Sequence, residues 1–167
     1  IREDYVSGPS TMTDEELQSN RTDMYEDLIS NKLITDNYWQ DRIPDHTKIK
    51  IPILSSANWG GQALHSRGNF EGFNKVASKE KWLEVHGLEH WTEFYTDYGI
   101  ELQKKFFGYY LKDEQNGWQN QPKVSIQVRY PNDKFELRNE NEWPLKNTSW
   151  IKFYLSPDEL SLEKESK

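Results

Sequence analysis

Two short apolar segments, separated by a turn and a helical stretch, constrain most strongly what this chain can fold into. Residues 49–55 form a nearly continuous apolar run, and Lys81–His86 form a second candidate strand. A short run that stays apolar on both sides suits a strand buried on both faces of a parallel sheet. Between the runs lie a glycine-containing turn at 58–61 and a stretch of helical periodicity at 63–77. The order strand, helix, strand predicts a right-handed βαβ unit.

An aromatic stripe follows the second predicted strand. From Trp91 onward a large apolar residue recurs at every fourth position, which is typical of one face of an amphipathic helix. The members of the stripe are Phe94, Tyr98, Leu102, Phe106 and Tyr110. We expect this face to pack on the parallel strands, so the predicted fold class is α/β.

The N-terminal part predicts cap-like helices at about 13–43. Thr13 and Glu16 have the spacing of a capping box, in which each side chain satisfies a backbone N–H of the other residue. A helix is therefore expected over about 13–31, followed by a short helix at 36–42.

The C-terminal part predicts a second domain. Residues 113–122 are polar, with Gly and Pro, and are interpreted as an interdomain linker. Alternating apolar residues at 124–128 and 151–155 predict half-buried strands of antiparallel type. Two or three strands form no stable sheet alone. We therefore divide the chain into part of an α/β domain at 1–112, the linker, and the beginning of a further domain at 123–167.

The composition narrows the classes of function. Asp and Glu number 28 against 21 Lys and Arg, so the net charge is −7. An acidic chain has no electrostatic reason to approach nucleic acid or an anionic membrane surface, and neither is expected as a partner. The chain has no cysteine, which excludes a thiol nucleophile and a Cys-ligated metal.

Several sequence signals are missing from the chain. No stretch approaches the roughly 18–20 consecutive apolar residues of a membrane span, and no secretory signal pattern is present, so a cytoplasmic location is expected. Phosphate-cradling glycine motifs and metal-ligand spacings are not found, so neither a cofactor nor a metal is expected. Because the chain begins at Ile1 and not at Met, we expect it to be a piece of a larger protein.

His90 is the candidate catalytic residue. It follows the second predicted strand within a short loop and precedes the long helix. In open α/β sheets, functional groups gather just beyond the carboxyl ends of the strands. A loop or capping histidine is the alternative interpretation. His86 is interpreted as structural, and His65 and His46 as solvated. No serine lies in a G-x-S-x-G elbow, and a base without a nucleophile cannot perform acyl transfer.

An ordered series of elements resembles the CocE/NonD hydrolases, a family that includes cocaine esterase and the X-Pro dipeptidyl-peptidases. The resemblance spans about residues 30–156, and Glu140–Leu145 resembles the opening of the family's C-terminal sandwich domain. The elements are, in chain order, Asp36–Arg42, Ile49–Leu54, the loop through Trp59, Phe70–Phe73, Lys81–Gly87, His90 and Leu102–Gly108.

The resemblance implies a fold and an activity. The fold would be the C-terminal part of an α/β-hydrolase domain, with parallel strands and flanking helices, followed by the first strands of a β-sandwich of jelly-roll type. The activity would be hydrolysis of an ester or amide, X-Pro peptides included, through an acyl-serine intermediate. His90 matches the family's general base, and the nucleophilic serine would lie outside this chain. The implied partners are a small ester, amide or peptide and the remainder of the parent hydrolase, with homo-oligomers left open.

The acid of the family's triad has no counterpart at its usual position. That position, two residues after Trp59, is Gly61. The acid would come from elsewhere, or Asn58 would orient the imidazole as a neutral acceptor. Glu89 is adjacent to His90 and should point elsewhere, and Glu71 lies too far along the following helix.

The remaining alternatives concern the tryptophans and the activity. Trp59 and Trp91 would line an acyl or proline pocket, or would simply pack under the loops. The vacant acid position favours a second function, a catalytically inactive hydrolase-like module retained for binding or assembly. A third, an aromatic-rich carbohydrate-binding module, rests on the Trp and Tyr content, and the parallel-strand signals argue against it.

Overall fold

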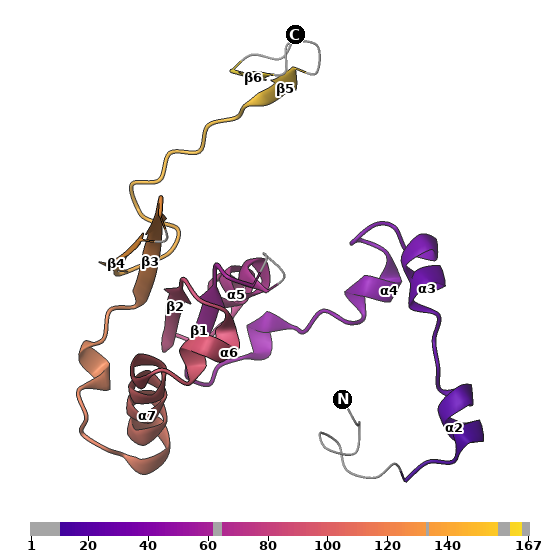
Figure 1. The fold of residues 1–167 in the computed structure, drawn as a ribbon, viewed down its shortest axis with the longest axis horizontal. Helices are drawn as coiled ribbons and strands as arrows, with labels where there is room; N and C mark the ends of the chain where they lie inside the picture. Colours follow the sequence, from indigo (N-terminus) through magenta and orange to yellow (C-terminus); the bar gives the residue numbers. More distant parts are fainter. Residues whose placement is uncertain (1–10, 62–64, 133, 157–160, 165–167) are drawn as a thin grey trace. The chain divides into compact units, whose positions relative to one another are not determined.

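The computed structural model describes residues 11–61, 65–132, 134–156 and 161–164. The chain divides into two units, Ile1–Asp45 and His46–Lys167. Figure 1 shows the elements in chain order. Among the described residues, no helix combines the length and the apolar character needed to cross a membrane.

From residue 11 onward, the first unit contains three short helices, α2 (Asp14–Ser19), α3 (Met24–Ser30) and α4 (Asn37–Gln40). The capping box of Thr13 and Glu16 is confirmed at the start of α2. The single helix expected over 13–31 is wrong, because Asp23 accepts hydrogen bonds from the backbone N–H groups of the next helix and starts it anew.

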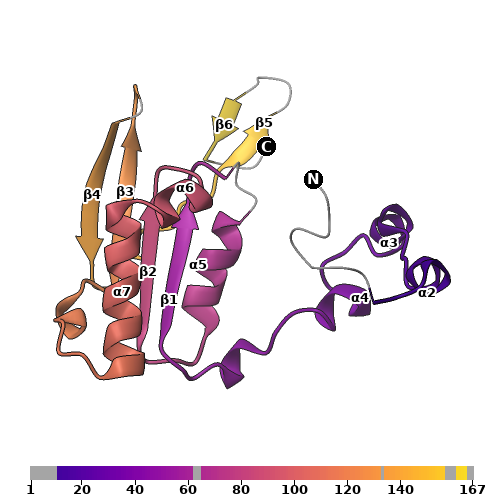
Figure 2. The same cartoon turned by 60° about the horizontal axis from the view of Figure 1, so that its bottom comes forward.

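The second unit is built on a four-stranded sheet in the order β1-β2-β3-β4, which Figure 2 shows side by side. Strand β1 (Ile53–Asn58) pairs in parallel with β2 (Lys81–His86), from Ile53↔Lys81 to Asn58↔His86. Helix α5 (Ser66–Lys75) connects them. The parallel βαβ arrangement expected for this part of the chain is therefore confirmed. The first strand begins later than expected, after the short helical turn η1 (His46–Lys48).

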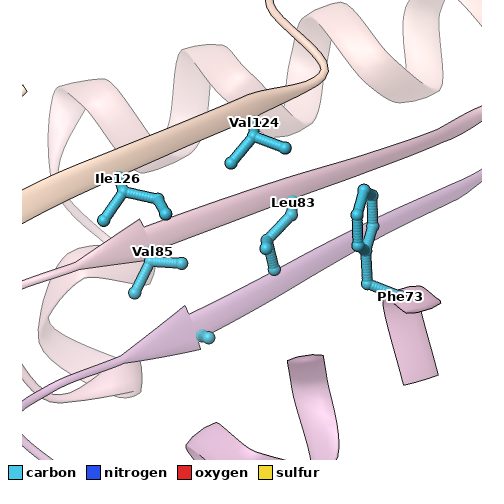
Figure 3. Close-up of a cluster of buried hydrophobic side chains, with 6 residues drawn as sticks. Phe73, Leu83, Val85, Val124 and Ile126 are labelled. Atoms are coloured by element: carbon cyan, nitrogen blue, oxygen red, sulfur yellow. The ribbon is translucent and has the colours of Figure 1, made fainter. Parts of the chain in front are cut away.

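The helices α6 (His90–Phe94) and α7 (Asp97–Lys112) follow β2. Side chains alternate along β2, so its two faces enter different clusters. One cluster packs under α5 (Figure 3) and contains Ala57, Phe73, Leu83, Val85, Val124 and Ile126. The other packs under α7 and contains Trp82, Phe106 and Trp118. The aromatic stripe is thus buried in part, through Phe106, against the sheet.

The segment expected to be an interdomain linker, 113–122, packs against the sheet instead. Within it, η2 (Trp118–Asn120) places the Trp118 ring 5.1 Å from the Trp82 ring and 5.2 Å from the Phe106 ring. Composition alone signalled a linker because polar residues surround this one buried tryptophan. Because Trp118 is buried against the sheet, the chain continues from it directly into the next strand of the same sheet.

Strand β3 (Val124–Tyr130) corrects the expected start of a second domain at 123. It pairs in parallel with β2 and in antiparallel fashion with β4 (Lys134–Glu140). Residues 123–140 therefore extend the α/β sheet. A separate two-stranded sheet, β5 (Tyr154–Ser156) and β6 (Ser161–Glu163), follows. The β-sandwich expected beyond this point stays a prediction.

The burial of Trp118 yields a stability prediction. Trp118 is 1% exposed, so Trp118→Ala removes an indole from the packed cluster and should lower the free energy of unfolding by about 3–5 kcal/mol. Trp150, which is 84% exposed, provides the matched control, and Trp150→Ala should change that free energy by less than about 0.5 kcal/mol. Urea denaturation of both variants measures the difference. Equal stability of the two would show that 113–122 is a linker after all.

Candidate functional site

The carboxyl ends of β1 and β2 lie at one edge of the sheet, since Asn58 and His86 are register partners. The loops that follow them are in contact. The backbone N–H of Trp59 donates to the carbonyl of His86 over 2.9 Å. A Cβ atom at Gly60 would lie 2.8 Å from the backbone nitrogen of Glu89, so only glycine permits this approach of the two loops.

Gln127 of β3 holds both loops. Its backbone carbonyl accepts a hydrogen bond from Trp59 Nε1 over 2.8 Å, and its side-chain oxygen accepts one from the Gly87 N–H over 2.8 Å. Sequence analysis missed this residue, because β3 was assigned to another domain. The parallel pairing of β2 and β3 brings Gln127 to the site.

His90 is exposed and is the first residue of α6. Its ring lies 5.4 Å from the ring of His65 and 4.5 Å from that of Trp91, both edge to face. His65, expected to be merely solvated, is therefore a neighbour of His90. In the described part of the chain, no carboxylate or amide is hydrogen-bonded to the His90 imidazole.

The two nearby acids weighed from the sequence engage other partners. Glu89 accepts a hydrogen bond from the hydroxyl of Thr92 over 3.2 Å. Glu71 forms an ion pair of 2.7 Å with Lys75 on α5, and this interaction lowers the pKa of Glu71. Neither carboxylate orients His90.

Asn58 fills the place of the missing acid. A Cβ atom at Gly61 would collide with Oδ1 of Asn58, so a side chain at position 61 requires the Asn58 side chain to move. The Asn58 side chain is buried, and its Oδ1 has no hydrogen-bond partner among the described residues. No hydrogen bond links Asn58 to His90 in that part of the chain, so its role as an orienter stays a prediction.

The two candidate tryptophans differ in their surroundings. Trp59 stacks on Phe70 with ring centroids 6.0 Å apart, and Phe70 contacts Trp143 at 5.2 Å. Trp91 is 58% exposed and touches His90. Trp59 is thus held by packing as well as by its bond to Gln127, while Trp91 presents a free face beside His90.

A buried histidine–carboxylate pair on β2 is the feature that sequence analysis undervalued. Nδ1 of His86 lies 3.0 Å from Oε2 of Glu84, and the two residues are only 2% and 3% exposed. The hydroxyl of Ser56 on β1 donates to the same Glu84 oxygen over 2.6 Å. The spacing of two between Glu84 and His86 in a predicted strand places them on one face, and this signal was available from the sequence.

Helices α6 and α7 cover this pair. Burial, the charges of Glu84 and Glu93, and a hydrogen bond to Glu84 raise the pKa of Tyr98, so its hydroxyl stays protonated and serves as a donor. A cavity of about 190 Å³ lies here, and apolar residues form much of its wall. Its polar lining comes from Ser56, Glu84, Glu93, Tyr98 and Gln103. Among the residues that the structure describes, no cluster of three or more His, Asp or Glu could hold a metal ion.

Comparison with known proteins shows which solved structures this chain resembles. No family model matches the sequence, and neither does any curated protein. Two crystal structures of a CocE/NonD family hydrolase from Staphylococcus aureus match 86% of this chain at 38% identity and a TM-score of 0.75. The resemblance to the CocE/NonD family is confirmed. The chain spans about a quarter (26%) of the length of that hydrolase.

The match supports a hydrolase family and an α/β sheet with flanking helices. The CocE/NonD pattern implied a base at His90 and an acid at position 61. The structure gives these two positions different surroundings. His90 is exposed at the start of α6, whereas the Asn58 side chain occupies the space beside position 61. The strand ends, and not the loop after β1, carry the buried polar groups of this site.

The contact between Gln127 and Gly87 yields a second prediction. Gln127→Leu leaves the buried N–H of Gly87 without an acceptor and should lower the free energy of unfolding by about 1–3 kcal/mol. Gln127→Glu retains an acceptor oxygen and is the control. Hydrogen exchange at the Gly87 amide should accelerate in the leucine variant only. Equal exchange in both variants would contradict a role for this bond.

Proposed function

We propose that this chain is a portion of a serine hydrolase that cleaves ester or amide bonds through an acyl-serine intermediate. Its likeness to a CocE/NonD family hydrolase at 38% identity is the observation that carries the proposal. The histidines and polar groups at the carboxyl edge of β1 and β2 support it, because open α/β sheets place their functional groups at that edge.

The nucleophile is proposed to come from residues outside this chain. Ser56 and Ser66 lie nearest the strand ends, and both hydroxyls have other partners. Ser56 donates to Glu84, and Ser66 donates to the backbone carbonyl of Asn58 over 2.5 Å. Neither hydroxyl has the histidine contact that would activate it.

The reaction would proceed in two halves. The serine oxygen attacks the carbonyl carbon, and its proton passes to the imidazole of a histidine from this chain. The carbon–oxygen or carbon–nitrogen bond then breaks, and the leaving group takes that proton. Water attacks the acyl-serine, gives a proton to the same imidazole, and releases a carboxylic acid as the serine recovers its hydrogen. The family resemblance assigns this histidine to His90.

A specific observation favours a second candidate function. Gly61 stands where the family carries its acid, the Asn58 side chain lies against it, and no carboxylate orients His90 among the described residues. A hydrolase-like module that binds a ligand or a partner without turnover would show this pattern. Activity of the complete protein decides between the two functions.

The experiment uses the complete protein that carries these residues. A fluorophosphonate probe should label one serine, and peptide mapping should place that serine outside residues 1–167. The same protein should hydrolyse a p-nitrophenyl ester, and prior labelling should abolish the hydrolysis. Turnover of an X-Pro p-nitroanilide in parallel distinguishes peptide from ester specificity. A protein that is neither labelled nor active would support the inactive module, and labelling of Ser56 or Ser66 would contradict an external nucleophile.

A further inference from the structure

Helix α6, which begins with His90, is too short to hold that residue in place by its own hydrogen bonds. It contains only the five residues His90–Phe94. Isolated helices shorter than about 12–15 residues are marginal in water, because the cost of forming the first turn is not recovered. The N-cap residue, Glu89, makes no capping hydrogen bond to the backbone of the helix. The position of His90 therefore depends on the contacts of α6 with neighbouring elements.

Thr96 joins the C-terminal end of α6 to the start of α7. Its hydroxyl donates to the backbone carbonyl of Glu93 over 2.8 Å and accepts a hydrogen bond from the N–H of Gly99 over 3.1 Å. Its backbone N–H donates to the same Glu93 carbonyl over 3.1 Å. Thr96 is thus the N-cap of α7 and also a donor to a carbonyl that the end of α6 leaves free.

Gly99 and Gln103 of α7 hold the same corner between the two helices. A Cβ atom at Gly99 would collide with the carbonyl oxygen of Glu93 and lie 3.0 Å from that of Phe94, so a larger residue would push α6 away. The side-chain amide of Gln103 donates to the carbonyl of Phe94 over 3.1 Å and to that of Gly99 over 3.0 Å. Two carbonyls at the end of α6 therefore receive hydrogen bonds from side chains of the next helical segment.

Helix α7 is in turn fixed to the sheet. Phe106 is buried, and its ring lies 6.5 Å from that of Trp82 on β2 and 5.2 Å from that of Trp118. Glu93 is buried as well, and it lines the cavity of about 190 Å³ together with Tyr98 of α7. The sheet thus fixes α7, and the corner fixes α6 to α7.

We infer that Thr96, Gly99 and Gln103 are positioning residues of this hydrolase, because they set where His90 stands beside the carboxyl edge of the sheet. This inference rests on the proposed function, in which the His90 imidazole takes the proton of the serine and returns it to the leaving group. A general base must lie within hydrogen-bond reach of the atom that gives up the proton. A displacement of about 1 Å can lower the rate about 100-fold, so the corner controls kcat through His90.

The first test alters the closest approach of the two helices in the complete protein, with a p-nitrophenyl ester as substrate. Gly99→Ala places a methyl group against the end of α6 and should lower kcat by about 10–100-fold, with KM within about twofold of wild type. Fluorophosphonate labelling of the serine should slow in parallel, because it needs the same base. Gly72→Ala is the matched control. Gly72 also lies within a helix, but its added Cβ would be in open space among the described residues, so kcat should be unchanged.

The second test removes and restores one hydroxyl. Thr96→Val keeps the shape of the side chain but loses both hydroxyl hydrogen bonds, and kcat should fall about tenfold at nearly constant KM. Thr96→Ser keeps the hydroxyl and should restore most of the rate. Thr13→Val is the control, because the Thr13 hydroxyl also accepts a backbone N–H as the N-cap of α2, in the other unit. It loses an equivalent cap and should leave kcat unchanged.

The outcomes separate this inference from the proposed function. Circular dichroism and thermal melting show which variants are folded, and if Gly99→Ala does not fold, the Thr96 pair decides. Wild-type kcat in either folded variant, Gly99→Ala or Thr96→Val, overturns the inference and leaves the proposed function standing. A loss confined to KM, or an equal loss of kcat in Thr13→Val, overturns it in the same way. A wild type that is neither labelled nor active overturns the proposed function and the inference with it.

Discussion

The register of β1 against β2 is the constraint on which the rest of the structure depends. With Asn58 opposite His86, the alternation of side chains sends Leu83 and Val85 into the cluster under α5, and Glu84 and His86 to the face covered by α7. A shift by one residue would exchange the two faces of the strand. Glu84 would then enter the apolar cluster without a donor, which is far more costly than burial beside Ser56. Hydrophobic packing and the polar pair therefore specify the same register.

The aromatic cluster of Trp82, Phe106 and Trp118 helps to position the loops at the strand ends. The chain is only 34% hydrophobic but 14% aromatic, so large rings supply much of its buried surface. Trp118, packed on Trp82 and Phe106, fixes the segment after α7 against the sheet. That segment leads into β3, and β3 carries Gln127 to the loops that follow β1 and β2. The loop geometry at the strand ends thus depends on a ring buried on α7's side of the sheet.

Local periodicity predicted the parallel strands, the helix between them and the aromatic stripe, because each of these patterns depends only on residues close together in the sequence. The strand that pairs in parallel with β3 is not predicted in this way, because it is distant from β3 in the sequence. The alternation at 124–128 indicates a half-buried strand, but it does not name the strand beside it. Moreover, α5 and α7 cover opposite faces of the sheet, while β1, β2 and β3 lie side by side in that order. The connection from β1 to β2 through α5 and the connection from β2 to β3 through α7 therefore have opposite hands. One of them departs from the right-handed rule, and reasoning from that rule does not lead to this topology.

The candidate site, too, was predictable only where it depends on residues close together in the sequence. The position of His90 just beyond a strand end was readable from the sequence, and so was the shared face of Glu84 and His86. Their hydrogen bond was not, because it depends on burial under α6 and α7 and on Tyr98, which is distant in sequence. Asn58 filling the space at Gly61 is likewise a matter of side-chain direction.

A carboxylate on a strand and one in a loop meet different physical demands. A loop acid keeps access to water, so its charge needs few donors, but the loop must be ordered to aim it. Glu84 lies on a buried strand, where the backbone already fixes its direction, and its charge must be satisfied entirely by protein groups. Ser56, His86 and Tyr98 come from three different elements and meet that need together. The polar residues that α7 and β1 direct at this face therefore make a buried acid at position 84 tolerable.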